Sequence, residues 1–330
     1  MTKPQISVLM PVKNAGPLLE DVLFGIAAQE GVAFELIIVD SGSSDGTLER
    51  VKTFADEAAF PVKVLSIEPA EFGHGKTRNF LARHARGDVL VYLTHDASPA
   101  SKHWLAHHLE HYRNPKVGLV FGSQLPRPDA HPTVRAELIS FFSGFAHNGA
   151  PTVYATEEGK GVDRSGAATD AIMRFNSNAN ASYRQEAWRE INFRDVSYSE
   201  DQLAAQDILK AGWHKVFEPR AAVLHSHNFG TWGFFQRYVD EWHGMYQAFG
   251  HVEVKRFWHL PLRMARTART NLRYLRNDPR LTSLQRMLWW PRVILHAKAR
   301  ELGGYIGPRL EKLPPNLARR LSREHKLINK

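Results

Sequence analysis

The sequence predicts an α/β fold with a mostly parallel central sheet. Two short apolar runs, at residues 6–10 and 36–39, flank a helical stretch, which is the pattern of a parallel βαβ unit. The alternation of apolar run and helical stretch then continues to about residue 121. Such alternation favours a sheet that is covered by helices on both faces.

The expected elements follow in order along the chain. Further strands are expected at residues 62–67, 89–93 and 117–121, and helices at 18–29, 48–58, 76–86 and 102–112. Beyond residue 122 the pattern is mixed, with helices at 134–145, 184–190 and 200–211 and strands at 171–175 and 221–225. We therefore expect one domain over 1–230, with halves at about 1–121 and 122–230, and a helical extension over 231–330.

Composition limits the class of protein. The chain has 330 residues, 43% of them apolar, and no cysteine, which excludes disulfides and thiolate metal sites and favours a reducing cytoplasm. No apolar run reaches the ~20 residues that a membrane span requires. Charge is uneven: residues 1–254 carry 24 Lys+Arg and 30 Asp+Glu (−6), and residues 255–330 carry 19 and 4 (+15), which sum to +9. The basic end predicts an anionic partner, either lipid headgroups or nucleic acid.

Two strands of the first half end on carboxylates. Asp40 follows the second strand and opens the turn Asp-Ser-Gly-Ser-Ser-Asp-Gly-Thr, and Asp96 follows the strand at 89–93. Ligands bind at the carboxyl ends of parallel strands, so both side chains are expected at one edge of the sheet. Asp40 and its turn suit a nucleotide, and Asp96 suits Mg²⁺ or Mn²⁺ that bridges phosphates. The alternative for Asp96 is a cap on the helix that begins near residue 101.

A glycine-rich loop, Phe-Gly-His-Gly-Lys-Thr-Arg-Asn at 72–79, opens a helix. Its backbone N–H groups, Lys76 and Arg78 could receive a diphosphate, and a plain solvated loop is the alternative. The spacing is not that of a P-loop, and the first strand lacks Gly-x-Gly-x-x-Gly, which counts against a dehydrogenase.

The second half contains two further candidates. Glu200 and Asp201 begin a helix, where one carboxylate could act as a general base and where a purely structural role at the positive end of the helix is the alternative. His225 and His227 follow an apolar strand, and one of them is expected to bind a metal ion. A hydrogen-bonded core histidine is the alternative for either.

As a set and in this order, the motifs resemble those of a nucleotide-sugar glycosyltransferase of family 2, with the GT-A fold, over about residues 4–245. The carriers are the Val-Asp-Ser-Gly-Ser turn, the Arg-Asn loop, the strand-ending Asp, the Glu-Asp pair and the late His. The segments Thr-His-Asp-Ala-Ser-Pro and Val-Leu-His-Ser-His-Asn-Phe are most similar to bacterial rhamnosyltransferases of surface polysaccharide synthesis.

The resemblance implies a role for each matching residue. Asp201 would be the catalytic base, and Asp96 with His225 would hold a divalent Mg²⁺ or Mn²⁺. Thr94 stands where the family's metal motif has its first Asp, so the metal would rest on fewer carboxylates. Acceptor-side contacts are implied at Asn178, Asn180 and Glu200. Contacts to the donor nucleotide are implied at Pro11, Lys13, Asn14, Asp40, Ser41, Lys76, Arg78, Asn79, His95 and Asp96.

The implied activity is inverting transfer of a sugar, L-rhamnose from dTDP-L-rhamnose, onto a glycan acceptor carried on a polyprenyl lipid. Another UDP- or GDP-sugar donor, a sugar-nucleotide nucleotidyltransferase and a nucleic-acid-binding protein are the alternatives. The acidic body and the lack of a recognisable nucleic-acid module favour no nucleic-acid partner. Residues 255–330, which mix Trp with Arg and Lys, are instead expected to bind an anionic inner-membrane surface from its cytoplasmic face.

Overall fold

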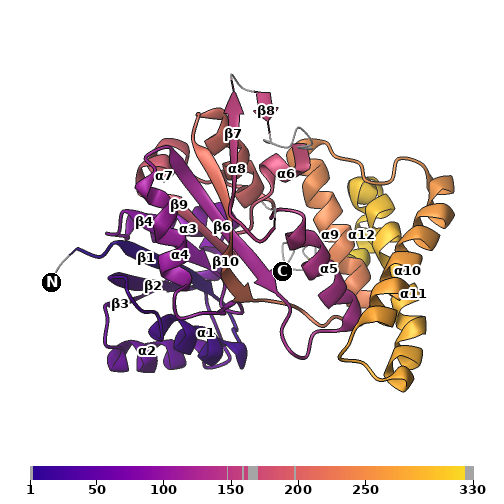
Figure 1. Cartoon of the computed structure of the whole chain (residues 1–330), viewed down its shortest axis with the longest axis horizontal. Helices are drawn as coiled ribbons and strands as arrows, with labels where there is room; N and C mark the ends of the chain where they lie inside the picture. The colour runs from indigo at the N-terminus through magenta and orange to yellow at the C-terminus, as the bar shows by residue number, and fades with distance from the viewer. Residues whose placement is uncertain (1–2, 147, 158–159, 163–169, 197, 324–330) are drawn as a thin grey trace. The chain divides into compact units, whose positions relative to one another are not determined.

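The computed structural model (Figure 1) describes residues 3–146, 148–157, 160–162, 170–196 and 198–323. It consists of two compact units, Met1–Arg127 with Ser140–His225, and Pro128–Ile139 with Ser226–Lys330. The division after His225 lies close to the expected boundary at 230. The segment 128–139 differs from expectation, because it belongs to the second unit although the sequence around it belongs to the first.

The first unit is built on a ten-stranded mixed sheet, so the α/β prediction is confirmed. The strand order is β3-β2-β1-β4-β9-β6-β10-β7-β8, and β5 pairs with β10. The strands are β1 Ile6–Val12, β2 Phe34–Asp40, β3 Val62–Ser66, β4 Val89–Leu93, β5 Ser98–Pro99, β6 Val117–Leu125, β7 Thr152–Glu157, β8 Lys160–Val162, β9 Asn180–Arg184 and β10 His214–Leu224.

Among β1, β2, β4, β6, β9 and β10, one strand runs against its neighbours. β1 is parallel to β2 and β4, and β6 is parallel to β10. β9 lies between β4 and β6 and is antiparallel to both, with Leu93 opposite Asn180. Consequently the carboxyl ends of β1, β2, β4, β6 and β10 and the start of β9 share one edge of the sheet.

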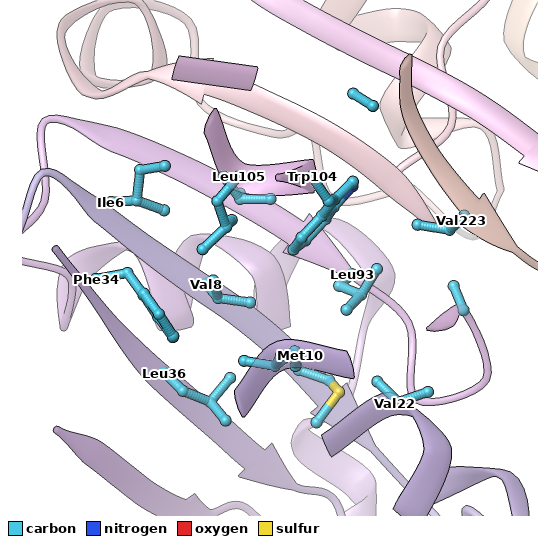
Figure 2. Packing of buried hydrophobic residues seen from close by; sticks show 14 of the residues in the cluster. Ile6, Val8, Met10, Val22, Phe34, Leu36, Leu93, Trp104, Leu105 and Val223 are labelled. Atoms are coloured by element: carbon cyan, nitrogen blue, oxygen red, sulfur yellow. The ribbon is translucent and has the colours of Figure 1, made fainter. Parts of the chain in front are cut away.

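The core of the first unit lies against one face of this sheet. Figure 2 shows Ile6, Val8 and Met10, alternate residues of β1, packed in a cluster with Trp104 and Leu105. Alternation of this kind follows from the period of two in a strand. Burial of β1 and β2 is nearly complete, as expected for parallel strands covered on both faces.

Helices connect the strands of the first unit. They are α1 Leu18–Ala27, α2 Thr47–Glu57, α3 His74–Arg83, α4 Trp104–Leu109, α6 Asp170–Arg174, α7 Gln185–Ile191 and α8 Glu200–Lys210, and α5 Pro132–Ser143 passes from one unit into the other. The strand expected at 171–175 was wrong, because this segment forms α6. β9 was not predicted at all.

The second unit is helical, as the sequence indicated. It contains α9 Thr231–Phe249, α10 Leu260–Asn277, α11 Ser283–Ile306 and α12 Pro315–Leu321. Its core gathers Val134, Phe234, Tyr238, Val239 and Leu310. Gly303 lets α11 approach α9 closely, since a Cβ there would lie 2.6 Å from the Cβ of Tyr238. Among the described residues, no helix has both the length and the apolarity needed to cross a bilayer.

Candidate functional site

Most of the candidate residues follow the strand ends that share one edge of the sheet. Asp40 ends β2, Asp96 lies three residues beyond β4, and His225 directly follows β10. Asn178 precedes β9, which begins at this edge because it runs against its neighbours. The topology therefore collects residues that are far apart in the chain.

The turn after β2 holds Asp40 in place. Asp40 is buried, and its Oδ2 accepts hydrogen bonds from the backbone N–H groups of Gly42 and Ser43, both at 3.0 Å. Its Oδ1 is buried as well and has no hydrogen-bond partner among the described residues. A buried acceptor without a partner is costly to keep, so this oxygen is suited to an N–H group of a ligand.

The end of β1 is tied to the same turn. Asn14 adopts a positive φ of 44°, its N–H donates to Ser43 Oγ (2.9 Å), and its Oδ1 accepts from the Ser44 N–H (2.8 Å). Lys13 is exposed and Pro11 is partly buried. Ser41 is buried, and its hydroxyl donates to the carbonyl of Val12 at 3.2 Å. This hydrogen bond links the ends of β1 and β2.

Asp96 and His225 form the candidate metal centre. His225 Nε2 lies 3.5 Å from Asp96 Oδ1, and both side chains are only partly exposed. A hydrogen bond from Arg127 holds the turn that carries Asp96, because Arg127 Nη2 donates to the backbone carbonyl of Asp96 at 2.7 Å. In the same turn, Thr94 Oγ1 is buried without a hydrogen-bond partner among the described residues, and His95 is partly buried.

Two residues that sequence reasoning missed connect this centre to the loop before β9. Gln124, at the end of β6, accepts a hydrogen bond through its Oε1 from His225 Nδ1 at 2.9 Å. Because an amide oxygen can only accept, Nδ1 carries a proton and Nε2 faces Asp96. Gln124 Nε2 donates to Ser177 Oγ at 2.9 Å. No motif marks either residue, since both become visible only when β6 and β9 are side by side.

Asp201 lies at the first turn of α8. Its Oδ2 accepts from the Asn178 N–H at 3.2 Å and its Oδ1 from the Gln202 N–H at 2.8 Å. Burial, with the neighbouring Glu200 carboxylate as the next cause, raises the pKa of Asp201 to about 7. A carboxylate with such a pKa can accept a proton at neutral pH.

Arg78 occupies a different place from the one expected. It was predicted to contact the donor, but it is buried and its Nη1 lies 2.7 Å from Glu200 Oε1. Glu200 was assigned to the acceptor side, and it is likewise buried, with Asn178 Nδ2 donating to it at 3.4 Å. Both charges of this ion pair act on the neighbouring Asp201 carboxylate. Lys76, two residues earlier in α3, remains exposed.

The glycine-rich loop is shaped by packing. A Cβ on Gly75 would lie 2.0 Å from the carbonyl oxygen of Arg194, so a side chain cannot fit there. Asn79, expected at the donor, is used in the same contact: its Nδ2 donates to the Phe193 carbonyl (2.8 Å), and its Oδ1 accepts from the Trp188 indole and the Phe193 N–H (both 3.0 Å). Both ends of the Asn79 amide are therefore used in contacts within the protein.

Asn180 also departs from its predicted role. It was expected to face the acceptor, but it is buried and bonded at both ends of its amide. Its Nδ2 donates to the carbonyls of Ser123 (3.0 Å) and Ala221 (2.7 Å), and its Oδ1 accepts from Trp104 Nε1 (2.9 Å). The Asn180 side chain therefore links β9 to β6 and β10 within the sheet. Asn178 is the asparagine next to the candidate base, Asp201.

A buried lysine supports the loop before β9. Lys215 in β10 is fully buried and donates to the carbonyls of Ile172, Met173 and Phe175 at 2.5–2.9 Å. Burial lowers the pKa of this amine well below its usual range. Lys215 thus caps the last carbonyl groups of α6. This cap holds the chain in place where the loop of residues 176–178 begins.

The sequence is similar to known proteins over most of its length. Residues 7–191 match the profile of glycosyl transferase family 2. The chain is 28% identical over 322 residues to the O-antigen chain rhamnosyltransferase RfbN of Salmonella typhimurium, covering 96% of this chain and 94% of that protein. It is 28% identical over 325 residues to the O-antigen chain rhamnosyltransferase WbaN of Salmonella anatum, covering 97% and 94%.

Solved structures share the fold. The mannosyltransferase PcManGT of Pyrobaculum calidifontis, determined with GDP-Man and Mn²⁺, superposes with a TM-score of 0.61 at 18% identity and covers 95% of this chain and 89% of its own. TarS of Staphylococcus aureus (residues 1–349) superposes with a TM-score of 0.51 at 14% identity, covering 93% and 91%. At these identities the likeness concerns the fold alone.

Proposed function

Because this chain belongs to glycosyl transferase family 2, we propose that it transfers L-rhamnose from dTDP-L-rhamnose, with inversion, to a lipid-linked glycan acceptor of a bacterial surface polysaccharide. The near full-length similarity to two O-antigen chain rhamnosyltransferases supports this choice of sugar and pathway. The observation that carries the proposal is the chain of contacts Asp96–His225–Gln124–Ser177, which leads from the candidate metal centre to the loop that holds Asp201.

Asp40 is proposed to read the donor base. A thymine or uracil ring presents an imino N–H, and Asp40 Oδ1 is a buried acceptor without a partner among the described residues. Its other oxygen is held by two backbone N–H groups, so the carboxylate cannot rotate freely. Guanine also presents an imino N–H, and thus this contact alone does not exclude a GDP-sugar.

The donor set fits a divalent cation. Asp96 Oδ1 and His225 Nε2 are 3.5 Å apart, which allows both to bind one ion, and oxygen with imidazole suits Mg²⁺ or Mn²⁺. Two protein ligands leave positions for diphosphate oxygens. When bound, the cation would neutralise charge that develops on the departing diphosphate. Gln124 fixes the tautomer of His225, and Arg127 fixes the turn of Asp96.

Asp201 is proposed as the general base. The acceptor hydroxyl gives its proton to the Asp201 carboxylate while its oxygen forms a bond to the anomeric carbon. The bond from that carbon to the diphosphate oxygen breaks, and the nucleoside diphosphate leaves with the electron pair. Attack from the face opposite the leaving group inverts the anomeric configuration. Asn178 holds the carboxylate in position through its backbone N–H.

The raised pKa of Asp201 predicts a pH dependence. Since the base must be ionised, kcat/KM is expected to rise with pH and to level off above about 7. Glu200→Gln removes the negative charge next to Asp201, and the positive charge of Arg78 remains without that counter-charge. Both effects favour the ionised form of Asp201. The midpoint should therefore move to lower pH in this variant. An unchanged midpoint would exclude a contribution of Glu200 to the raised pKa of Asp201. Glu190→Gln, on α7, is the matched control.

The proposed acceptor is carried on a polyprenyl lipid, so the enzyme is expected to work at the cytoplasmic face of an anionic inner membrane, held there by residues 255–330. This region is not a detachable tail. Ala299, Leu310 and Ala318 belong to the core of the second unit. Deleting 255–330 would expose that core, and for this reason the membrane contact needs to be tested with surface substitutions.

The activity is tested by a donor screen. dTDP-L-rhamnose with Mn²⁺ is expected to raise the melting temperature of the protein more than UDP- or GDP-sugars do. Asp40→Asn should reduce this stabilisation, because a charged acceptor is replaced, whereas Asp56→Asn on α2 should not. Product analysis then separates the enzyme classes: release of dTDP supports a glycosyltransferase, and release of pyrophosphate would identify a nucleotidyltransferase instead.

A further inference from the structure

The two long helices α10 and α11 of the second unit carry outward faces of contrasting chemistry. On α10, Arg266, Arg269, Arg273 and Arg276 recur at intervals of three and four residues, which places them along one face of the helix. All four are exposed, and α10 contains no acidic residue. Arg263, by contrast, points inward and pairs with Glu301 at 2.5 Å and with Glu253.

The outward face of α11 is apolar. The spacing of its exposed apolar residues follows the helical period, so they form a stripe along one side of the helix, on which Lys298 is also exposed. Their exposed fractions range from 36% to 66%. The opposite face, with Val293, His296 and Ala297, is buried. The stripe consists of Leu284, Met287, Leu288, Trp290, Ile294, Leu295 and Leu302.

A contiguous apolar stripe of this length is unusual on the surface of a soluble unit and indicates a binding surface. Further exposed apolar side chains lie just before and at the start of α10: Phe257 and Trp258, in the 3₁₀ turn Phe257–His259, and Leu262 are 56–61% exposed. Arg256 stacks on Trp258 and Arg292 on Trp289, which places cations and indole rings together. Tryptophan with arginine is typical of the interface between headgroups and acyl chains.

We propose that the arginine stripe of α10 and the apolar stripe of α11 form a surface that inserts shallowly into an anionic lipid bilayer. The inference deepens the proposed membrane location by naming the residues that make the contact, and it does not require the catalytic assignment. Apolar side chains enter the acyl boundary, while the long arginine side chains reach phosphate groups of the lipid.

The charges favour this occupant over two others. A second copy of the chain on this surface would bring arginine stripes without acidic partners together, and like charges repel. The phosphates of a nucleic acid could pair with the arginines, but a nucleic acid would leave the seven apolar side chains in contact with water. A bilayer that contains anionic lipid satisfies both stripes at once.

The test uses the full-length protein and co-sedimentation with two kinds of vesicle, phosphatidylcholine mixed with phosphatidylglycerol, and phosphatidylcholine alone. The wild-type protein should bind the anionic vesicles much more strongly. Two neutralised arginines, Arg269→Gln with Arg273→Gln, should weaken that binding by at least ~10-fold. Leu284→Gln with Leu288→Gln, which removes two members of the apolar stripe that are 61% and 66% exposed, should weaken it by at least ~10-fold.

Matched controls lie on the first unit. Phe24→Gln removes an exposed apolar side chain of α1, and Lys52→Gln with Arg83→Gln removes two exposed cations, so neither should change vesicle binding. Asp201→Asn should bind vesicles like the wild-type protein, which separates this inference from the catalytic one. The proposal is overturned if the wild-type protein does not bind anionic vesicles, or if the stripe variants bind them as strongly as the wild-type protein does. It is also overturned if the wild-type protein dimerises through this surface and the stripe variants do not.

Discussion

Replacement of Asp201 by Asn is expected to lower turnover by at least about 10²–10⁴-fold, the usual contribution of a general base. The substitution keeps the size of the side chain and one oxygen for the backbone N–H groups of Asn178 or Gln202. It removes the group that accepts the proton of the attacking hydroxyl. Donor binding should change little, since Asp201 is assigned no contact to the nucleotide.

The measurement is steady-state turnover together with calorimetric binding of the donor. Asp207→Asn is the matched control, because Asp207 lies on the same helix and forms a partly exposed ion pair with Arg194. That control should retain turnover close to that of the wild-type protein. If Asp201→Asn did so too, the assignment of the base would be wrong.

Asp96→Ala is expected to abolish the dependence of donor binding on a divalent cation. Asp96 is the carboxylate in the candidate metal centre, since Thr94 supplies only a hydroxyl in the same turn. Loss of the group that holds the cation at the diphosphate should cost about 10²–10³-fold in turnover, as for other lost electrostatic contacts of this kind. In the wild-type protein, a chelator should produce the same loss.

Calorimetry of donor binding with and without a chelator measures this effect. In Asp96→Ala the two titrations should coincide. His225→Ala should give a similar loss, and the double variant should add little, because the two side chains would serve one ion. Asp88→Asn, an exposed carboxylate just before β4, is the control. Full metal dependence in Asp96→Ala would contradict the proposed centre.

The position of the site could be predicted from the sequence because it depends on topology. Apolar runs that end on Asp40 and Asp96 predict parallel strands, and parallel strands bring their ends to one edge. Their local roles could not be predicted in the same way. Arg78 and Asn79 follow a glycine-rich loop, yet Arg78 pairs with Glu200 and Asn79 bonds to residues 188 and 193. These partners lie more than a hundred residues away.

Two elements show why local sequence was insufficient elsewhere. The run Ala-Ile-Met-Arg-Phe at 171–175 is too short for its period to distinguish strand from helix, and it forms α6. β9, Asn-Ala-Ser-Tyr-Arg, carries polar residues in the centre of a sheet. They are tolerated because Asn180 bonds to Trp104 and His108, and Ser182 bonds to His108 and Tyr112. Burial lowers the pKa of His108 to about 4, which keeps it neutral.

The reversed direction of β9 has a consequence for how such an enzyme can diversify. Every other central strand delivers its last residues to the reaction edge, but β9 delivers the loop that precedes it, with Ser177 and Asn178. The loop that we propose for the acceptor side therefore lies between strands whose ends we propose for the nucleotide, and it is not continuous with them. If both proposals hold, changes confined to this loop should alter acceptor preference and leave donor recognition unchanged.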